Sequence, residues 1–264
     1  MFAFVKNLRI FLIALVGGIL FVATKYLFHH FGWEIVEQSS LHNSVISSVT
    51  FVIGFLLSAS IADYKESERI PSDFAANIED MYEDAASIHV SYPVFDLEGF
   101  RMQLKIIAEG FGNDARRQSF DVRQEIKELS AYFATMEQGK VPPNFVVKLK
   151  QQQTQLLRQR HRVNYIQRIK FIPSATLLVR SIVGMTLLLL LLTNIDPFYG
   201  GLAITGLIVF VQIYMLVLIN VISLPFHPAG TTRDDVSLFL IDDTITYLSK
   251  EARAKKSQRT RKRS

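Results

Sequence analysis

The chain alternates between long apolar runs and long polar segments, and the apolar runs come in two pairs. The runs occupy residues 10–28, 45–62, 172–192 and 202–222. A helix needs about 17–25 predominantly apolar residues to cross the hydrocarbon core of a bilayer, and each run is about that long. The pattern therefore predicts an all-α membrane protein with four transmembrane helices, over about residues 8–28, 44–62, 172–193 and 202–222.

The polar segment between the two pairs has the spacing of amphipathic helices. Pro71, in the sequence Ile70-Pro71-Ser72-Asp73, predicts a helix start because proline fits the first helical turn. Tyr92-Pro93 predicts the end of that helix. Glycine, asparagine and proline then predict breaks at 110–113 and 139–143, which separate further helices over 95–111, 115–136 and 143–170.

The helix predicted over 143–170 is rich in Gln, Arg and Lys, and its apolar stripe is sparse. We expect it to pack against neighbouring subunits or to line a wet vestibule. Ile172-Pro173 predicts a kink at the membrane entry that follows. The domain boundaries are a first transmembrane pair at 1–62, a cytoplasmic helical domain at 63–171, a second transmembrane pair at 172–223, and a C-terminal helix with a basic, disordered tail at 224–264.

The basic residues predict the orientation in the membrane. The connections 29–43 and 194–201 contain no Lys or Arg, so the positive-inside rule places both termini and the middle segment in the cytoplasm, as in a protein of the cell (inner) membrane. A cleaved signal peptide is the alternative for the first run, although its apolar core is long for one. Within the runs, Lys25 is expected to snorkel, and Arg180 either snorkels or attracts anions at the inner mouth. Gln212 and Asn220 are expected to hydrogen-bond across helices.

The second run differs from a normal lipid-facing span. It carries Phe51 and Phe55 one helical turn apart, together with hydroxyl side chains at Ser44, Ser47, Ser48, Thr50, Ser58 and Ser60. A hydroxyl face with an aromatic pair suits a symmetric assembly around a narrow water path, in which apolar rings can gate ion flow by dewetting. The alternative is that the two rings only pack against other helices.

Short motifs also follow one another in a fixed order from the second run to the C-terminus. They are Gly54-Phe55 in the second run, Ile172-Pro173 before the third, Leu224-Pro225-Phe226 after the fourth, and Thr232-Arg233-Asp234-Asp235 followed by Ile241-Asp242-Asp243. In order and spacing this set resembles the bestrophin family of ion channels over about residues 44–250. It departs from the family at 63–68, where bestrophins have tryptophans and a basic residue, and at 227–232, which carries no carboxylate.

The resemblance implies a homopentamer in the membrane lipid with one central pore for inorganic ions. Its neck would be lined by Ser47, Phe51 and Phe55, and a second, cytoplasmic constriction would lie near Phe145 or Val146. Most relatives conduct anions and some bacterial ones favour cations. We therefore expect an oligomeric, chloride-type ion channel with a hydrophobic neck gate. The alternatives are a cation-selective channel of the same kind and a non-conducting membrane scaffold that binds a cytoplasmic partner.

Acidic residues are the remaining candidates for chemistry. Asp234 and Asp235 suggest a calcium site, since calcium prefers carboxylate oxygens, but they equally suit the N-cap of a helix that begins near Val236. Glu79, Asp80, Glu83 and Asp84 predict a solvated or Arg-paired face that could also draw cations into a vestibule. The sequence has no glycine-rich phosphate loop, nucleophile elbow or zinc-ligand spacing, so we expect neither an enzyme nor a cofactor, and no nucleic-acid partner.

Overall fold

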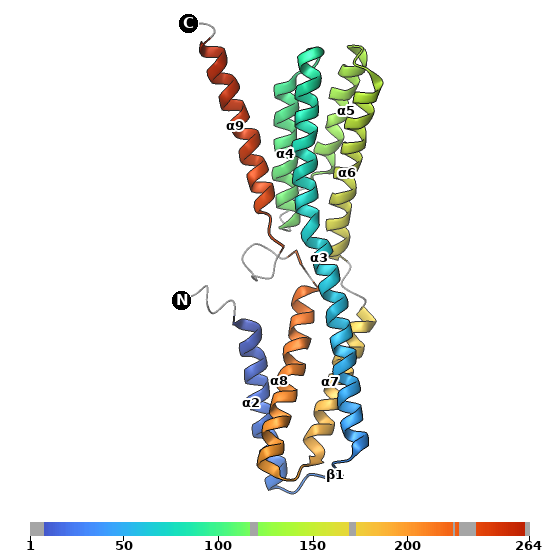
Figure 1. Cartoon of the computed structure of the whole chain (residues 1–264), viewed down its shortest axis with the longest axis vertical. Coiled ribbons are helices and arrows are strands. Elements are labelled where there is room, and N and C mark those ends of the chain that lie inside the picture. The colour runs from blue at the N-terminus through green and yellow to red at the C-terminus, as the bar shows by residue number, and fades with distance from the viewer. Residues whose placement is uncertain (1–7, 117–120, 169–172, 224, 227–235, 262–264) are drawn as a thin grey trace. The chain divides into compact units, whose positions relative to one another are not determined.

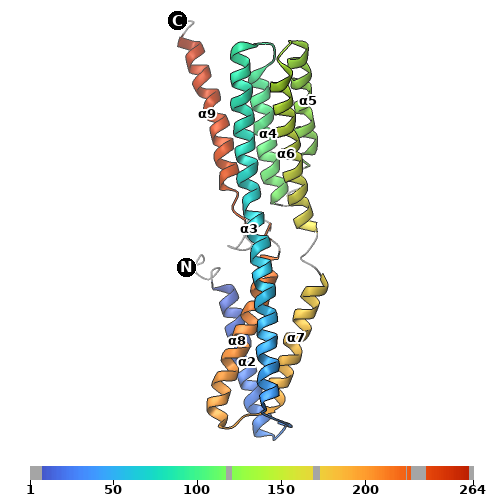
Figure 2. The ribbon, with the colours of Figure 1, turned by 45° about the vertical axis from the view of Figure 1, so that its right-hand side comes forward.

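The protein is α-helical and folds as two compact units (Figure 1, Figure 2). The structure, a computed structural model, describes residues 8–116, 121–168, 173–223, 225–226 and 236–261, and the side chains of 168, 173–176 and 251–261 are not described. Unit 1 comprises Met1–Tyr64, Ile169–Pro225 and Thr232–Asp234, and unit 2 comprises Lys65–Arg168, Phe226–Thr231 and Asp235–Ser264.

Unit 1 contains the apolar helices. They are α2 (Arg9–His30), the first part of α3 (Ser40–Ser91), α7 (Pro173–Leu192) and α8 (Phe198–Ile222). The short strands β1 (Val36–Glu37) and β2 (Thr193–Asn194) pair in parallel, with Val36 opposite Thr193. Among the described residues, α2, α3 and α8 are long and apolar enough to cross a membrane, whereas the apolar part of α7, Leu177–Leu192, is shorter. The all-α membrane fold is confirmed, and the fourth span stays a prediction.

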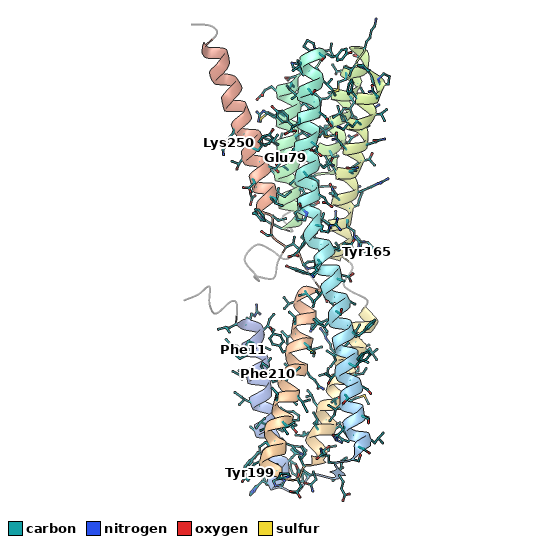
Figure 3. The ribbon with its side chains drawn as sticks, viewed as in Figure 1. Phe11, Glu79, Tyr165, Tyr199, Phe210 and Lys250 are labelled. Carbon is teal, nitrogen blue, oxygen red and sulfur yellow. The ribbon has the colours of Figure 1, made fainter. Side chains whose placement is uncertain are left out.

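Helices α2 and α8 lie side by side along their length (Figure 1). Small residues allow the close approach: a Cβ added at Gly17 would lie 2.9 Å from Ile213 Cδ1, and one added at Gly206 would lie 2.7 Å from Val22 Cγ2. Phe11 and Phe210, which Figure 3 labels, meet edge to face at 5.5 Å between ring centroids. Glycine-lined contacts are typical of helices that associate in lipid, where van der Waals packing replaces the hydrophobic effect.

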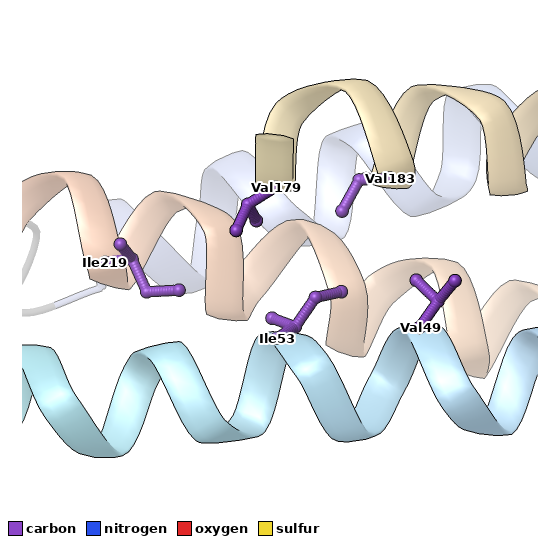
Figure 4. Packing of buried hydrophobic residues seen from close by; sticks show 5 residues of the cluster. All are labelled: Val49, Ile53, Val179, Val183 and Ile219. Carbon is purple, nitrogen blue, oxygen red and sulfur yellow. The ribbon is translucent and has the colours of Figure 1, made fainter. Parts of the chain in front are cut away.

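The core of unit 1 joins α3 to α7 and α8. Figure 4 shows its buried members, which are Val49, Ile53, Val179, Val183 and Ile219. Val49 and Ile53 are one helical turn apart, so they occupy the same side of α3. The side of α3 that carries Val49 and Ile53 therefore faces the interior of unit 1.

Unit 2 is a helical bundle with its own core. It contains residues 65–91 of α3, α4 (Leu97–Ala115), α5 (Arg123–Gln138), α6 (Pro143–Arg168) and α9 (Phe239–Arg261). Helix α4 packs on α9, and α5 packs on α6. Phe74 and Phe111 stack in the interior at 3.8 Å between ring centroids. Each fully buried aliphatic or aromatic side chain in such a bundle contributes roughly 1.5–3 kcal/mol.

Several predicted helix boundaries are confirmed, and several are wrong. Helix α3 ends at Ser91, before Tyr92-Pro93, while α5 ends before Gly139 and α6 begins at Pro143, as predicted. The start predicted at Pro71 is wrong, because α3 runs through Pro71 without ending. Proline removes one backbone hydrogen bond from a helix, and burial of Ile70 and Phe74 on either side offsets that loss.

The break predicted at 110–113 is also wrong. Gly110 and Gly112 lie inside α4 and are buried, and α5 begins only at Arg123. A Cβ added at Gly112 would lie 3.7 Å from Ile241 Cγ2 of α9, so this glycine is a helix contact and not a terminator. The tail predicted to be disordered from residue 255 is helical through Arg261.

One side of helix α6 packs within its own chain, and the expectation that this helix lines a vestibule or meets a neighbouring subunit stays a prediction. Its apolar stripe is buried at Val146, Leu149, Leu156 and Val163. Its polar side chains bond to other helices: Gln153 Nε2 donates to the Ile126 carbonyl at 2.7 Å, and Arg160 Nε lies 3.1 Å from Asp114 Oδ2. Composition alone missed this because glutamine and arginine pack well once each of their donors finds an acceptor.

Arg160 connects α6 to both ends of the α4–α5 connection. Its guanidinium pairs with Asp114 at 3.1 Å and with Asp121 at 3.0 Å, and its side chain is only 8% exposed. A hydrogen bond from the backbone of Arg123 lowers the pKa of Asp121; burial opposes this, and the charge of Arg160 adds to the lowering. The pair of Arg160 with Asp114 is largely removed from solvent, whereas the side chain of Asp121 is 61% exposed.

Replacing Arg160 should destabilise unit 2 more than replacing a nearby exposed arginine. Arg160→Met removes a buried positive charge from beside the Asp114 carboxylate, which is 13% exposed, and we expect a loss of about 3 kcal/mol. Arg162→Met is the control, because Arg162 pairs with Glu66 at the surface, where such pairs contribute less than about 1 kcal/mol. Thermal unfolding in detergent, followed by circular dichroism, measures both. Equal melting temperatures for the two variants would contradict the assignment.

Candidate functional site

The predicted neck residues lie on the exposed side of α3. Phe51 and Phe55 are 75% and 69% exposed, and Ser47 is exposed on the same side. The opposite side carries Val49 and Ile53, which are buried in the core of unit 1. Phe51 and Phe55 are therefore not packed in the core of their own chain. They are available to lipid, to water or to another copy of the chain.

Three of the hydroxyl groups near these rings are bonded to their own helix. Ser44 donates to the Ser40 carbonyl at 2.9 Å, Ser48 to the Ser44 carbonyl at 2.8 Å, and Thr50 to the Ile46 carbonyl at 2.9 Å. Such bonds satisfy the hydroxyl hydrogen and leave oxygen lone pairs facing outward. These three hydroxyl groups can thus still accept hydrogen bonds from water.

The two residues predicted for a cytoplasmic constriction have different surroundings. Phe145 is 41% exposed near the start of α6, whereas Val146 is 1% exposed inside unit 2. Adjacent residues on a helix point about 100° apart, so the register that buries Val146 turns Phe145 outward. Only Phe145 is placed to contact anything outside its own chain.

Arg180, predicted to snorkel or to attract anions, is bonded across two helices. Its Nη2 donates to Asn220 Oδ1 at 2.8 Å, which joins α7 to α8. The prediction that Asn220 bonds between helices is therefore confirmed. Gln212, given the same role, is fully buried, and within the described part of the chain neither end of its amide has a hydrogen-bond partner.

Lys25 is fully buried, which corrects the expectation that it snorkels. Its Nζ lies 2.5 Å from Glu34 Oε1, and it also donates to the carbonyls of Leu191 (3.1 Å) and Thr193. Leu191 lies in the last turn of α7 and Thr193 directly follows it, where no further helical turn supplies donors. A cation at a helix C-terminus also favours the helix dipole. Lys25 thus caps α7 from α2.

Glu34, which is also buried, and His29, whose side chain is 42% exposed, complete what we call the buried ion cluster: Lys25, His29 and Glu34. His29 Nδ1 lies 2.7 Å from Glu34 Oε2, and its ring stacks on Phe198 at 3.6 Å between centroids. Burial raises the pKa of Glu34, but hydrogen bonds from His29 and Lys25 and their charges outweigh this and hold it below the ordinary 4.5. The cluster joins the ends of α2 and α7 to the first residue of α8.

The acidic residues have varied partners. Glu79 Oε1 accepts from Thr244 at 2.6 Å and Asp84 Oδ1 from Lys148 at 2.7 Å, whereas Asp80 and Glu83 are exposed on α3. Asp234 and Asp235, the calcium candidates, lie outside the described residues, as do Ile172 and Leu224. In the part of the chain that the structure describes, no group of three or more His, Asp or Glu side chains could hold a metal ion.

Comparison with solved structures places this arrangement in a known fold. A tryptophan-to-alanine variant of a bacterial bestrophin homologue from Klebsiella pneumoniae superposes with a TM-score of 0.78 at 12% identity, over 92% of this chain and 96% of that one. A tyrosine-to-alanine variant of the Klebsiella homologue gives 0.74 at 13% identity, over 91% and 97%. The structure of that homologue phased on zinc gives 0.73 at 13% identity, over 92% and 97%. This chain has the bestrophin fold.

The bestrophin fold agrees with the resemblance drawn from short motifs. No protein-family model matches the sequence, and no curated protein matches it significantly. At 12–13% identity the likeness to the solved structures lies in the fold, and it spans nearly the whole chain. The motif order predicted that fold although few residues are shared.

Sequence reasoning missed the buried ion cluster. In the sequence Lys25 stands alone as a cation near the end of a span, and Glu34 lies nine positions later in the α2–β1 connection. The sequence does contain one indication of this pair. Glu34 is an acidic residue in a connection without Lys or Arg, and it lies close in sequence to Lys25, a cation within a transmembrane run. The α7 carbonyls that Lys25 also binds are more than 160 positions away, and no sequence pattern indicates them.

Removing Lys25 should weaken unit 1. Lys25→Met leaves Glu34 buried with His29 as its remaining partner and leaves the end of α7 uncapped, so we expect a loss of about 3 kcal/mol. The double variant Lys25→Met/Glu34→Gln removes both charges and should recover part of the loss. Lys105→Met is the control, because Lys105 pairs with the half-exposed Glu109 at 3.7 Å. Melting temperatures in detergent measure all three, and a Lys25→Met protein as stable as the control would refute the role of the cluster.

Proposed function

We propose that copies of this chain assemble in the membrane as an ion channel, with α3 of each copy facing a shared axis and Phe51 and Phe55 lining the neck. The observation that carries the proposal is the exposure of both rings on a helix whose opposite side is buried in its own chain. The bestrophin fold supports the same assignment. A pentamer with cytoplasmic termini in the cell membrane is the assembly that the motif order and the basic residues favour.

The two exposed helices of unit 1 differ in a way that supports this orientation. The exposed side of α2 is aliphatic, with Leu12, Val16, Ile19 and Leu20 all more than 40% exposed. The exposed side of α3 combines two phenylalanines with serines. Aliphatic side chains suit lipid, whereas rings with hydroxyl groups suit a narrow path that water enters and leaves.

The proposed mechanism is hydrophobic gating. Rings of Phe51 and Phe55 around an axis exclude water when they are close, because a narrow apolar constriction dewets. When they separate, water and ions pass, and the hydroxyl face with Ser47 hydrates the path. Phe145 is the candidate for a second, cytoplasmic constriction, since it is exposed while Val146 is buried.

The first candidate for the permeant ion is an anion such as chloride. The edges of aromatic rings carry partial positive charge, so rings that present their edges to the path favour an anion over a cation. Arg180 would add a fixed positive charge to the subunit. This is the selectivity that most relatives with the family's motifs have.

A cation is the second candidate, favoured by the exposed carboxylates of Asp80 and Glu83 on the unit 2 part of α3. They lie three positions apart and therefore on neighbouring positions of one helix face. Rings of Asp or Glu side chains select cations in channels by concentrating them near the path. Whether the channel selects anions or cations depends on whether the permeating ions meet the ring edges and Arg180 or the carboxylates of Asp80 and Glu83.

Shortening the neck side chains should raise conductance. Phe51→Ala/Phe55→Ala widens the proposed constriction and removes its apolar rings, so ion flux through reconstituted liposomes should rise severalfold above that of the unmodified protein. The unmodified protein should itself exceed empty liposomes. Phe11→Ala is the control, because it removes the same side chain from α2, and its flux should not change. No flux from the unmodified protein, together with a monomeric mass in detergent, would favour the scaffold alternative.

The reversal potential under a salt gradient distinguishes the two ions. If cations permeate, Asp80→Asn/Glu83→Gln should shift the reversal potential toward the anion equilibrium value, because the carboxylates no longer concentrate cations. If anions permeate, the unmodified protein already reverses near that value and the double variant changes it little. Glu109→Gln, on α4, removes a carboxylate elsewhere in unit 2 and should leave the reversal potential unchanged in both cases.

A further inference from the structure

Aromatic side chains collect where α2 ends and α8 begins. We define this aromatic cap as Tyr26, Phe28, Phe31, Trp33 and Tyr199. Phe31, Trp33 and Tyr199 are 60%, 55% and 78% exposed. Phe198 connects the two sides, with its ring centroid 6.3 Å from that of Tyr26 and 5.6 Å from that of Tyr199 (Figure 3 labels Tyr199).

The backbone at the end of α2 holds Trp33 in place. Gly32 has a φ of 68°, Trp33 N donates to the Phe28 carbonyl at 2.9 Å, and Gly32 N donates to the His29 carbonyl at 3.1 Å. This is the Schellman pattern of helix termination, in which glycine adopts the left-handed conformation. The apolar contact that accompanies such ends is present, because Trp33 meets Phe28 edge to face at 5.2 Å. Phe31 also stacks on Trp33, at 5.2 Å between ring centroids.

The cap continues the aliphatic side of α2. The exposed residues Val16, Ile19 and Leu20 precede it on the helix, and Leu27, 51% exposed, joins them to the cap. Two charged groups of this region are turned inward, because Lys25 is fully buried and the side chain of Glu34 is 6% exposed, whereas Glu37 and Asp196 are exposed. The surface therefore combines aromatic rings with polar groups at the point where two membrane-length helices end.

We propose that the aromatic cap lies in the headgroup region of the phospholipid bilayer and sets the depth of unit 1 in the membrane. Tryptophan and tyrosine concentrate at membrane–water interfaces because one part of each ring system is apolar and another forms hydrogen bonds. The cap lies at the ends of α2 and α8, so insertion of these helices carries it to the boundary. The inference requires membrane insertion and does not require ion conduction.

The chain contains one tryptophan, so Trp33 reports on the cap without an added probe. The unmodified protein is reconstituted into phosphatidylcholine vesicles whose acyl chains are brominated either near the headgroup or near the methyl end. Bromine quenches tryptophan on contact, so the shallow bromine should lower the emission by roughly half and the deep bromine by much less, as expected for a ring at the interface. Acrylamide in the aqueous phase should quench weakly.

Each other outcome overturns the proposal in a distinct way. Strong quenching by acrylamide with none by brominated lipid places Trp33 in water. Stronger quenching by the deep bromine places it in the hydrocarbon core. Quenching by neither means that a second copy of the chain covers the cap. None of these readings depends on flux, so a conducting protein can fail this test and a non-conducting one can pass it.

A matched variant controls for the location of the fluorophore. Trp33→Phe/Tyr165→Trp moves the single tryptophan to α6 of unit 2, where Tyr165 is 53% exposed, similar to Trp33. Its emission should be quenched by acrylamide and not by either brominated lipid. Similar lipid quenching of both proteins would show that the signal does not report on the cap.

Discussion

The contact of Val49 and Ile53 with α7 and α8 decides which side of α3 remains free. In lipid this contact has no hydrophobic driving force of its own, so it depends on shape and on close van der Waals packing. Once these two side chains are buried, the 3.6-residue repeat turns Phe51 and Phe55 to the opposite side. The proposed neck is therefore a consequence of the core of unit 1.

The buried ion cluster supports that core from one end. A charged amine inside a membrane domain is stabilised only when its hydrogen bonds and its charge are both matched, and Lys25 has a carboxylate and two helix-end carbonyls. The same contacts satisfy the end of α7, which would otherwise leave carbonyl groups unpaired. Thr193 Oγ1, beside this cluster, also lies 3.3 Å from His42 Nδ1 on α3, so the cluster and the start of the neck helix share a neighbour.

The surfaces of unit 1 have different chemistry because they meet different surroundings in the proposed assembly. The aliphatic side of α2 and the aromatic cap suit lipid and its headgroups, and the phenylalanine and hydroxyl side of α3 suits a water path. Unit 2 relies on water-exposed and buried polar contacts instead, as at Arg160, and its core has ordinary aromatic packing such as Phe74 on Phe111. The packing of unit 1 is thus typical of a domain in lipid, and the packing of unit 2 is typical of a domain in water.

Apolar run lengths and motif order were enough to predict an all-α membrane protein with the bestrophin fold, because a bilayer imposes the length and apolar composition of a span regardless of what it packs against. The same reasoning located the end of α3 and the α5–α6 break, which are backbone effects of proline and glycine. Only the tertiary structure decided that Pro71 and Gly112 lie inside helices, since burial against residues distant in sequence outweighed their local preference. It also separated Phe145 from Val146, and it paired Lys25 with Glu34 and with carbonyls of α7. A sequence records how residues alternate along one helix, and it contains no direct record of which groups the fold brings together from far along the chain.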